Sequence, residues 1–148
     1  MLDMEIKSQQ ESQNTQSVPR KIFILGQQNL QNSILVGVIS QQTRIECSLI
    51  DRFSPEASNL LDRLNTLILI DADSISYEKA THFLDTLNQL SQPPCVALLN
   101  CRPNGRHEKL ITWPQVNGIF NRDTPQDKLV KGISGIITNA GNITQLTL

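Results

Sequence analysis

The chain has 148 residues, a formal charge of −1 and a pI near 6.1. Its length suits one domain with a sizeable core, and its scattered Lys and Arg residues argue against a nucleic-acid surface, which would cluster them. No apolar run approaches the roughly 20 residues that a membrane span needs, and the N-terminus lacks the apolar segment of a signal peptide. We therefore expect a single cytoplasmic domain with no membrane contact.

The first residues differ in composition from the rest of the chain. They are rich in Gln, Ser and Asn, and few of their side chains can be buried in a core. This composition predicts a disordered N-terminal arm over residues 1–19, which ends at Pro19. Residues 20–148 are then predicted to form one folded domain.

Short apolar runs alternate with helical repeats in the folded part of the chain. Strands are predicted at residues 21–26, 44–49, 67–71, 95–99 and 117–120. The unbroken Leu/Ile run of the third strand is typical of a strand that is buried on both faces, as in parallel sheets. The second strand alternates polar and apolar residues, which indicates that one of its faces is more exposed.

Capping residues mark where the helices between these strands begin. Asn29, Ser54 and Ser76 are each followed by apolar residues at helical spacing, and a Thr-Pro pair opens the last helix. The first helix carries Leu30, Ile34, Leu35 and Val38 at helical spacing. A short helix is also predicted around residues 107–111.

Five strands alternating with five helices predict a parallel sheet with right-handed crossovers. The size favours a flavodoxin-like, or CheY-like, doubly wound (βα)5 fold of the α/β class, with the strand order 2-1-3-4-5. In such sheets function lies outside the carboxyl ends of the strands, at the switch point where the strand order reverses. Asp71 and the loop over residues 26–29 are expected to meet at this switch point.

Asp71, at the end of the predicted third strand, has the position of the phosphoacceptor in a response-regulator receiver domain. Phosphoryl transfer to a carboxylate needs Mg²⁺, which prefers oxygen ligands such as carboxylates. Receivers supply an acidic pair after strand one, a Ser or Thr after strand four and a Lys after strand five. The corresponding positions here hold Gln27-Gln28, Asn100-Cys101 and Asn121-Arg122. Asp71 is therefore predicted to be an inactive, hydrogen-bonded or solvated carboxylate, and a phosphorylatable Asp71 remains the alternative.

The cysteine and histidine residues indicate neither a metal site nor an enzyme. The spacing of Cys95, Cys101 and His107 matches no common zinc pattern. His82 falls within a predicted helix and His107 in a loop region, so neither is placed beside Asp71 as a catalytic base. We expect no metal, no cofactor and no catalytic residue.

Two stretches, over residues 111–120 and 127–136, are more specific than the fold. They resemble the receiver-like N-terminal half of the CsgD/VpsT group of LuxR-type transcription regulators, and residues 69–71 and 98–101 fit the same pattern. The resemblance implies an incomplete receiver site and a role in the control of biofilm matrix and curli genes. It also implies a DNA-binding helix-turn-helix domain that follows the receiver-like domain and is absent from these 148 residues.

Some members of this group bind cyclic di-GMP through a motif after the fifth helix: an aromatic residue, a hydrophobic residue, Thr or Ser, and Arg. Arg suits such a site because its planar guanidinium binds guanine and phosphate and stacks on flat rings. The matching residues here are Asn142-Ile143-Thr144-Gln145, which keep the hydrophobic residue and the Thr. The resemblance thus implies Thr144 and Gln145 as the candidate ligand-binding residues.

The predicted function is that of a non-enzymatic, degenerate receiver-like regulatory domain over residues 20–148. We expect it to form a homodimer and thereby to position the DNA-binding domains of a transcription regulator of biofilm matrix genes. Contact with DNA is then made only through a domain outside this chain. Two alternatives stay open: a cyclic di-GMP sensor, and a receiver that is phosphorylated on Asp71.

Overall fold

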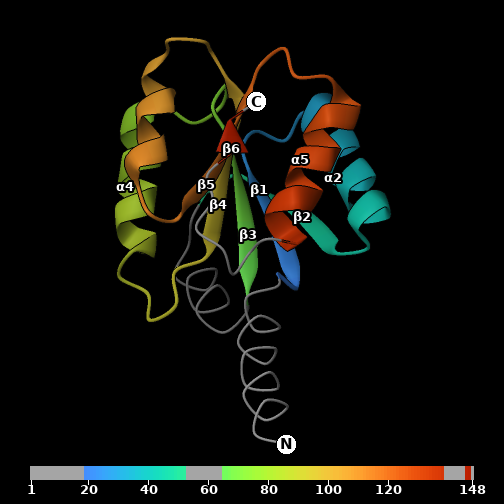
Figure 1. Cartoon of the computed structure of the whole chain (residues 1–148), viewed down its shortest axis with the longest axis horizontal. Helices are drawn as coiled ribbons and strands as arrows, with labels where there is room; N and C mark the ends of the chain where they lie inside the picture. The colour runs from blue at the N-terminus through green and yellow to red at the C-terminus, as the bar shows by residue number, and fades with distance from the viewer. Residues whose placement is uncertain (1–18, 53–64, 139–145, 148) are drawn as a thin grey trace, which may run out of the picture.

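The computed structural model describes residues 19–52, 65–138 and 146–147. They form a parallel sheet with the strand order β2-β1-β3-β4-β5-β6 and helices on both faces (Figure 1). The strands are β1 (Lys21–Leu25), β2 (Glu46–Ile50), β3 (Thr66–Asp71), β4 (Cys95–Cys101), β5 (Val116–Asn121) and β6 (Leu146–Thr147). The helices are α2 (Leu30–Thr43), α4 (Tyr77–Leu87), α5 (Gln126–Thr138) and the 3-10 helix η1 (Arg106–Thr112). No helix in these ranges is long and apolar enough to cross a membrane.

The order of the first five strands confirms the predicted 2-1-3-4-5 arrangement. The sheet also has a sixth strand, β6, which pairs with β5 and is too short to leave a periodic pattern in the sequence. Two predictions lie outside the described residues. These are the helix that begins at Ser54 and the N-terminal arm, of which only the buried Pro19 is described.

The observed strands differ from the predicted ones mainly at their ends. β2 begins at Glu46 and not at Arg44, because Arg44 takes a left-handed conformation, with φ 59°, that ends α2. β4 continues to Cys101, past its predicted end at Leu99. The extension brings Asn100 into the strand, at the carboxyl edge of the sheet.

Successive residues of the central strand β3 face opposite sides of the sheet. Ile68 and Ile70 belong to the core cluster that also includes residues of α4 and η1, whereas Leu67 and Leu69 belong to the cluster that includes residues of α2 and α5. Figure 1 shows the two helical layers on either side of the sheet. Every residue of β3 is buried, which explains the unbroken apolar run from Leu67 to Ile70.

Helix α2 does not bury all of its apolar residues that lie at helical spacing. Its buried residues are Asn32, Leu35 and Ile39, whereas Leu30 and Ile34 are 76% and 51% exposed. Of the four apolar residues at helical spacing, only Leu35 is buried, so the spacing does not identify the buried face of the helix. The physical reason is the amide of Asn32, whose hydrogen bond to the carboxylate at the end of β3 turns this face of the helix toward the sheet.

Two isoleucines of α2 give a matched test of this orientation. Ile39→Ala removes a side chain that is 0% exposed and should lower the free energy of unfolding by about 2–5 kcal/mol. Ile34→Ala, on the exposed side of the same helix, should change it by less than about 1 kcal/mol. Urea unfolding followed by circular dichroism measures both values. Equal losses would contradict the observed packing of α2.

Candidate functional site

Asp71 lies at the carboxyl end of β3 and is only 2% exposed. Its Oδ1 accepts hydrogen bonds from Asn100 Nδ2 at 2.8 Å and from the Asp73 N–H at 3.0 Å. Its Oδ2 accepts from Ser74 Oγ at 2.6 Å and from Asn32 Nδ2 at 3.1 Å. A buried charge needs such partners because its removal from water is costly. Both oxygens of this carboxylate are thus engaged by the protein itself.

The side-chain donors come from three separate segments of the fold. Asn32 belongs to the first turn of α2, and its N–H donates to the side chain of the N-cap residue Asn29. Asn100 lies near the end of β4 with φ 58°, a left-handed conformation that Asn adopts more readily than most residues. Ser74 lies in the turn after β3, and its N–H donates to the carbonyl of Asp71. The site therefore forms only when α2, β3 and β4 are packed together.

The loop after β1 packs against this cluster at the switch point of the sheet. The N–H of Gln27 donates to Ser74 Oγ at 3.1 Å, and the Gln27 carbonyl accepts from Asn32 Nδ2 at 2.9 Å. Gly26 approaches Asp71 so closely that an added Cβ would lie 2.8 Å from the Asp71 Cβ. The expected meeting of this loop with Asp71 is thus confirmed.

The pKa of Asp71 reflects two opposing effects. Burial raises this pKa, but the hydrogen bonds from Asn100, Ser74, Asn32 and the Asp73 N–H together lower it by more, so that it lies below the usual 3.8. The carboxylate is therefore charged at neutral pH. Its hydrogen-bond donors are all neutral groups, so the charge is stabilised by dipoles.

The side chains at the other receiver positions do not supply the chemistry of a complete site. Gln27 and Gln28 are exposed and carry no charge. Cys101 is buried, and burial raises the pKa of its thiol to about 12. Arg122 Nε lies 3.7 Å from Asp73 Oδ2, an exposed ion pair of the kind that contributes little to stability. Within the described ranges, no group of three or more His, Cys, Asp or Glu side chains could hold a metal ion.

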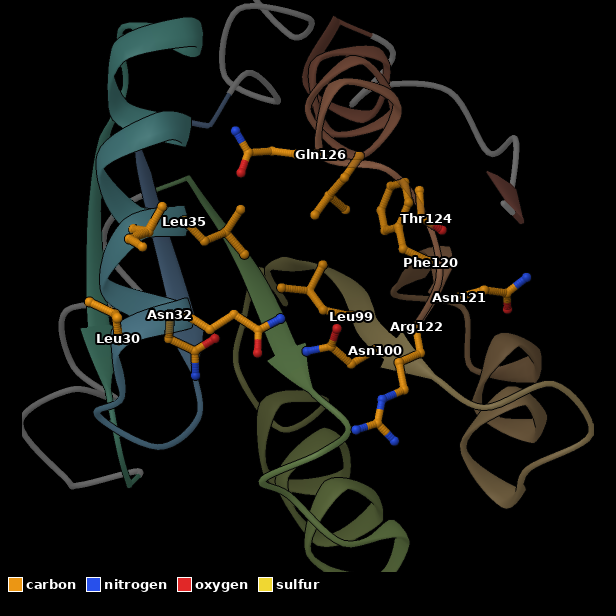
Figure 2. A pocket seen from close by; sticks show the side chains of 13 residues that line it. Leu30, Asn32, Leu35, Leu99, Asn100, Phe120, Asn121, Arg122, Thr124 and Gln126 are labelled. Carbon is orange, nitrogen blue, oxygen red and sulfur yellow. The ribbon is translucent and has the colours of Figure 1, made fainter.

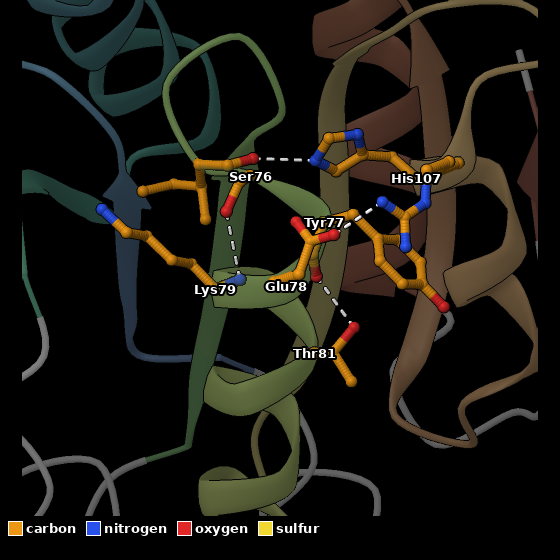
Figure 3. A network of polar contacts seen from close by, with 8 residues as sticks. Ser76, Tyr77, Glu78, Lys79, Thr81 and His107 are labelled. Carbon is orange, nitrogen blue, oxygen red and sulfur yellow. Dashed lines mark hydrogen bonds and ion pairs between the residues drawn. The ribbon is translucent and has the colours of Figure 1, made fainter.

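His107 belongs to a separate polar network on the α4 side of the sheet. Its Nε2 lies 2.7 Å from the Ile75 carbonyl (Figure 3). The neighbouring Arg106 pairs with Glu78 at 2.6 Å and lies over the ring of Tyr77, with 4.4 Å between Cζ and the ring centre. These contacts join η1 to the start of α4. They give His107 a structural role that does not involve the carboxylate at the end of β3.

Two donors of the site, Asn32 and Ser74, were not predicted from the sequence, and two predicted residues have no described position. The signal for Asn32 is a polar residue on the helix face that buries Leu35. The signal for Ser74 is its place in a turn after Asp71, because Asp side chains often bond the backbone two residues on. Thr144 and Gln145, the candidate ligand-binding residues, lie outside the described residues.

A parallel sheet with the order 2-1-3-4-5 and a carboxylate at the end of its third strand defines the class: this is a receiver-like domain. The family follows from comparison with models of known protein families. The model described as VpsT-like, receiver domain matches residues 24–145, which is most of the chain. The chain belongs to this family of VpsT-like receiver domains.

Two known proteins are similar to the chain. The CsgBAC operon transcriptional regulatory protein of Escherichia coli (strain K12) is 25% identical over 80 residues, which cover 54% of this chain and 37% of that protein. The match therefore spans less than half of the relative's length. The crystal structure of the regulatory domain of the master biofilm regulator CsgD has a TM-score of 0.66 and 18% identity, and the match covers 86% of this chain and 92% of that chain. At this identity the likeness shows the fold alone.

The close approach of Gly26 to the cluster predicts the effect of adding a methyl group. In Gly26→Ala the new Cβ would lie 2.8 Å from Asp71 Cβ and 3.1 Å from Asn32 Nδ2, so the buried side chains must shift. We expect the free energy of unfolding to fall by about 1–3 kcal/mol in urea titrations. Gly37→Ala is the control, because nothing lies within 4 Å of its added Cβ. It should raise the free energy of unfolding by up to about 1 kcal/mol. A Gly26→Ala variant that is as stable as the wild type or more stable would contradict the contact.

Asp71 should make the stability of the domain depend on pH in the acid range. Its pKa in the folded protein is lower than the unfolded value of 3.8, so its contribution is present above that value and is lost as the pH falls toward the folded pKa. Asp71→Asn should lower the free energy of unfolding at neutral pH. It should also make the free energy of unfolding depend less on pH in the acid range. Urea unfolding between neutral pH and about pH 2 measures the difference. If the free energy of unfolding fell equally with pH in the wild type and in Asp71→Asn, this role of Asp71 would be disproved.

Proposed function

We propose that this chain is a non-catalytic receiver-like domain of a transcription regulator, in which Asp71 holds the switch point together and accepts no phosphoryl group. One observation carries the proposal: both oxygens of the buried Asp71 carboxylate already accept hydrogen bonds from neutral donors. In this state the carboxylate connects α2, β3 and β4 through its hydrogen bonds. The domain then regulates through its surface and its assembly.

Phosphoryl transfer would require some of these hydrogen bonds to Asp71 to break. One oxygen of Asp71 must leave its donors to bond phosphorus, and a bound Mg²⁺ must neutralise the phosphoryl oxygens. The loop that supplies the acidic pair in complete receivers supplies Gln27 and Gln28 here, and amides bring no charge to a cation site. The residue after β5 is Arg122, whose fork-shaped guanidinium does not replace a Lys at a tight site.

The regulatory role rests on the family. The VpsT-like receiver model covers residues 24–145, and the similar protein of Escherichia coli is by name a transcriptional regulatory protein of the CsgBAC operon. We infer that the domain forms a homodimer in the cytoplasm and positions DNA-binding domains at biofilm matrix genes. The chain's own net charge of −1 supports leaving contact with DNA to those domains.

Sensing of cyclic di-GMP is the second candidate function, and one observation favours it. The family match extends to residue 145 and so includes Ile143 and Thr144, which keep two positions of the motif that some relatives use. Asn142 and Gln145 replace the aromatic residue and the Arg. A neutral Gln145 provides no charged contact to phosphate. Ligand-independent assembly therefore ranks first.

One set of light-scattering measurements separates these functions. The purified chain should have the mass of a dimer by itself, and acetyl phosphate with Mg²⁺ or cyclic di-GMP should leave that mass unchanged. Mass spectrometry of the acetyl phosphate sample should detect no added phosphoryl group, because the oxygens of Asp71 are engaged by their donors.

Matched variants identify the result that would contradict the proposal. A phosphoryl group gained by the wild-type chain and not by Asp71→Asn would establish a phosphorylatable receiver. A dimer that forms only with cyclic di-GMP, and is lost in Thr144→Ala, would establish a nucleotide sensor. A monomer under all three conditions would contradict the assembly role.

A further inference from the structure

A cavity of about 520 Å³ opens between α2, α5 and the carboxyl ends of β4 and β5 (Figure 2). Its volume falls within the range of roughly 300–1,000 Å³ that is typical of small-molecule sites. Asp71 is not among the described residues that line it. The cavity is therefore distinct from the carboxylate cluster, although it lies beside it.

Most of the inner wall of the cavity is apolar. Leu35 of α2, Leu99 of β4 and Phe120 of β5 contribute to this wall, as Figure 2 shows, and Leu129 of α5 adds to it. These side chains come from four elements, so the cavity, which is partly open to solvent, is formed by the packing of the fold and not by one loop. A wall of this kind suits the apolar body of a ligand, because burial of apolar surface drives binding.

Two further apolar side chains lie at the cavity and face water. Leu30 and Ile34 of α2 line it, and they are the large hydrophobic residues that stand out as exposed in the described part of the chain. Their exposure follows from the orientation of α2, which turns Asn32 toward the sheet. A ligand in the cavity would cover part of this apolar surface.

Arg122 is the only charged residue among the described residues that line the cavity. The other polar lining residues are neutral amides and one Thr. Its guanidinium is half exposed, and its ion pair with Asp73 is loose, with 3.7 Å between Nε and Oδ2. Among the described residues this guanidinium makes no other ion pair or hydrogen bond, although the backbone N–H of Arg122 donates to the Cys101 carbonyl. A guanidinium in this state is available for a two-point contact with a carboxylate or phosphate.

Asn100 lies at the boundary between the cavity and the Asp71 cluster. It lines the cavity, donates to Asp71 Oδ1 and has the left-handed φ of 58°. Non-glycine residues in this conformation often occur at functional sites. Asn32 likewise contacts both sites, since it lines the cavity and donates to Asp71 Oδ2. These amide donors stand between the buried negative charge and the cavity.

We propose that this cavity binds a small organic anion, whose apolar body lies between α2 and α5 and whose carboxylate or phosphate contacts Arg122. The proposal follows from the apolar wall, from Arg122 as the single charged lining residue with only a loose ion pair, and from the exposed Leu30 and Ile34. It goes beyond the proposed function, because it requires neither phosphoryl transfer to Asp71 nor cyclic di-GMP.

Anilinonaphthalene sulfonate is a suitable probe, since it joins an apolar ring system to one anionic group and fluoresces when it leaves water. N-phenylnaphthylamine has the same rings without the charge. The wild-type chain should bind both. Arg122→Gln should lower the affinity for the sulfonate probe by about tenfold or more, the usual effect of losing a charged hydrogen bond. The affinity for the neutral probe should stay within about twofold of the wild-type value. Ile34→Glu places a negative charge at an exposed position beside the cavity, so it should also lower the affinity for the negatively charged sulfonate probe.

Arg20→Gln is the matched control, because it removes an exposed Arg that does not line the cavity and should not affect either probe. Circular dichroism must show that all variants are folded. Competition with decanoate and with decyl phosphate then reveals which anionic group is preferred, and displacement by either supports the proposal. Equal sulfonate binding by wild type and Arg122→Gln would overturn it. Probe binding that disappears as the chain dimerises would also overturn it, because a second copy would then be the occupant.

Discussion

The hydrogen bonds to the buried carboxylate of Asp71 are the interaction on which the switch point of this domain depends. A charge that is 2% exposed is stable only if the protein replaces the water it has lost. The replacement comes from Asn32 on α2, Ser74 after β3 and Asn100 on β4. Ser74 and Asn32 also hold the loop after β1 in place through further hydrogen bonds to Gln27. The bond from Asn32 sets which face of α2 meets the sheet, and Asn32 and Asn100 line one side of the adjacent cavity.

Much of the fold was predictable from the sequence because its signal is local. The apolar run from Leu67 to Ile70, followed by Asp71, predicted both the parallel sheet and the place of the site, because this strand is buried on both faces. The orientation of α2 was not predictable in the same way. Leu30 and Ile34 continue a helical apolar spacing, but the tertiary contact between Asn32 and Asp71 outweighs it. Propensity and periodicity carry no information about such a contact.

The candidate site was predicted in position and only partly in composition. The missing acidic pair could be predicted from the sequence, because Gln27 and Gln28 occupy that place in the chain and carry no carboxylate. Two of the donors to Asp71, Asn32 and Asn100, lie 39 and 29 positions away in the sequence, and only the folded sheet brings them to the carboxylate. Family membership adds the regulatory context. It does not assign the cavity between α2 and α5, whose apolar wall and single cation are visible only in three dimensions.

A double-mutant cycle between Asp71 and Asn100 tests the structural role of this carboxylate most directly. The free energy of unfolding is measured at neutral pH for the wild type, Asp71→Ala, Asn100→Ala and the double variant. If Asn100 holds the charge as the 2.8 Å contact indicates, the two residues should be coupled by about 1.5–3 kcal/mol, the range for a hydrogen bond to a charged group. Effects that add to within about 0.5 kcal/mol would contradict the account.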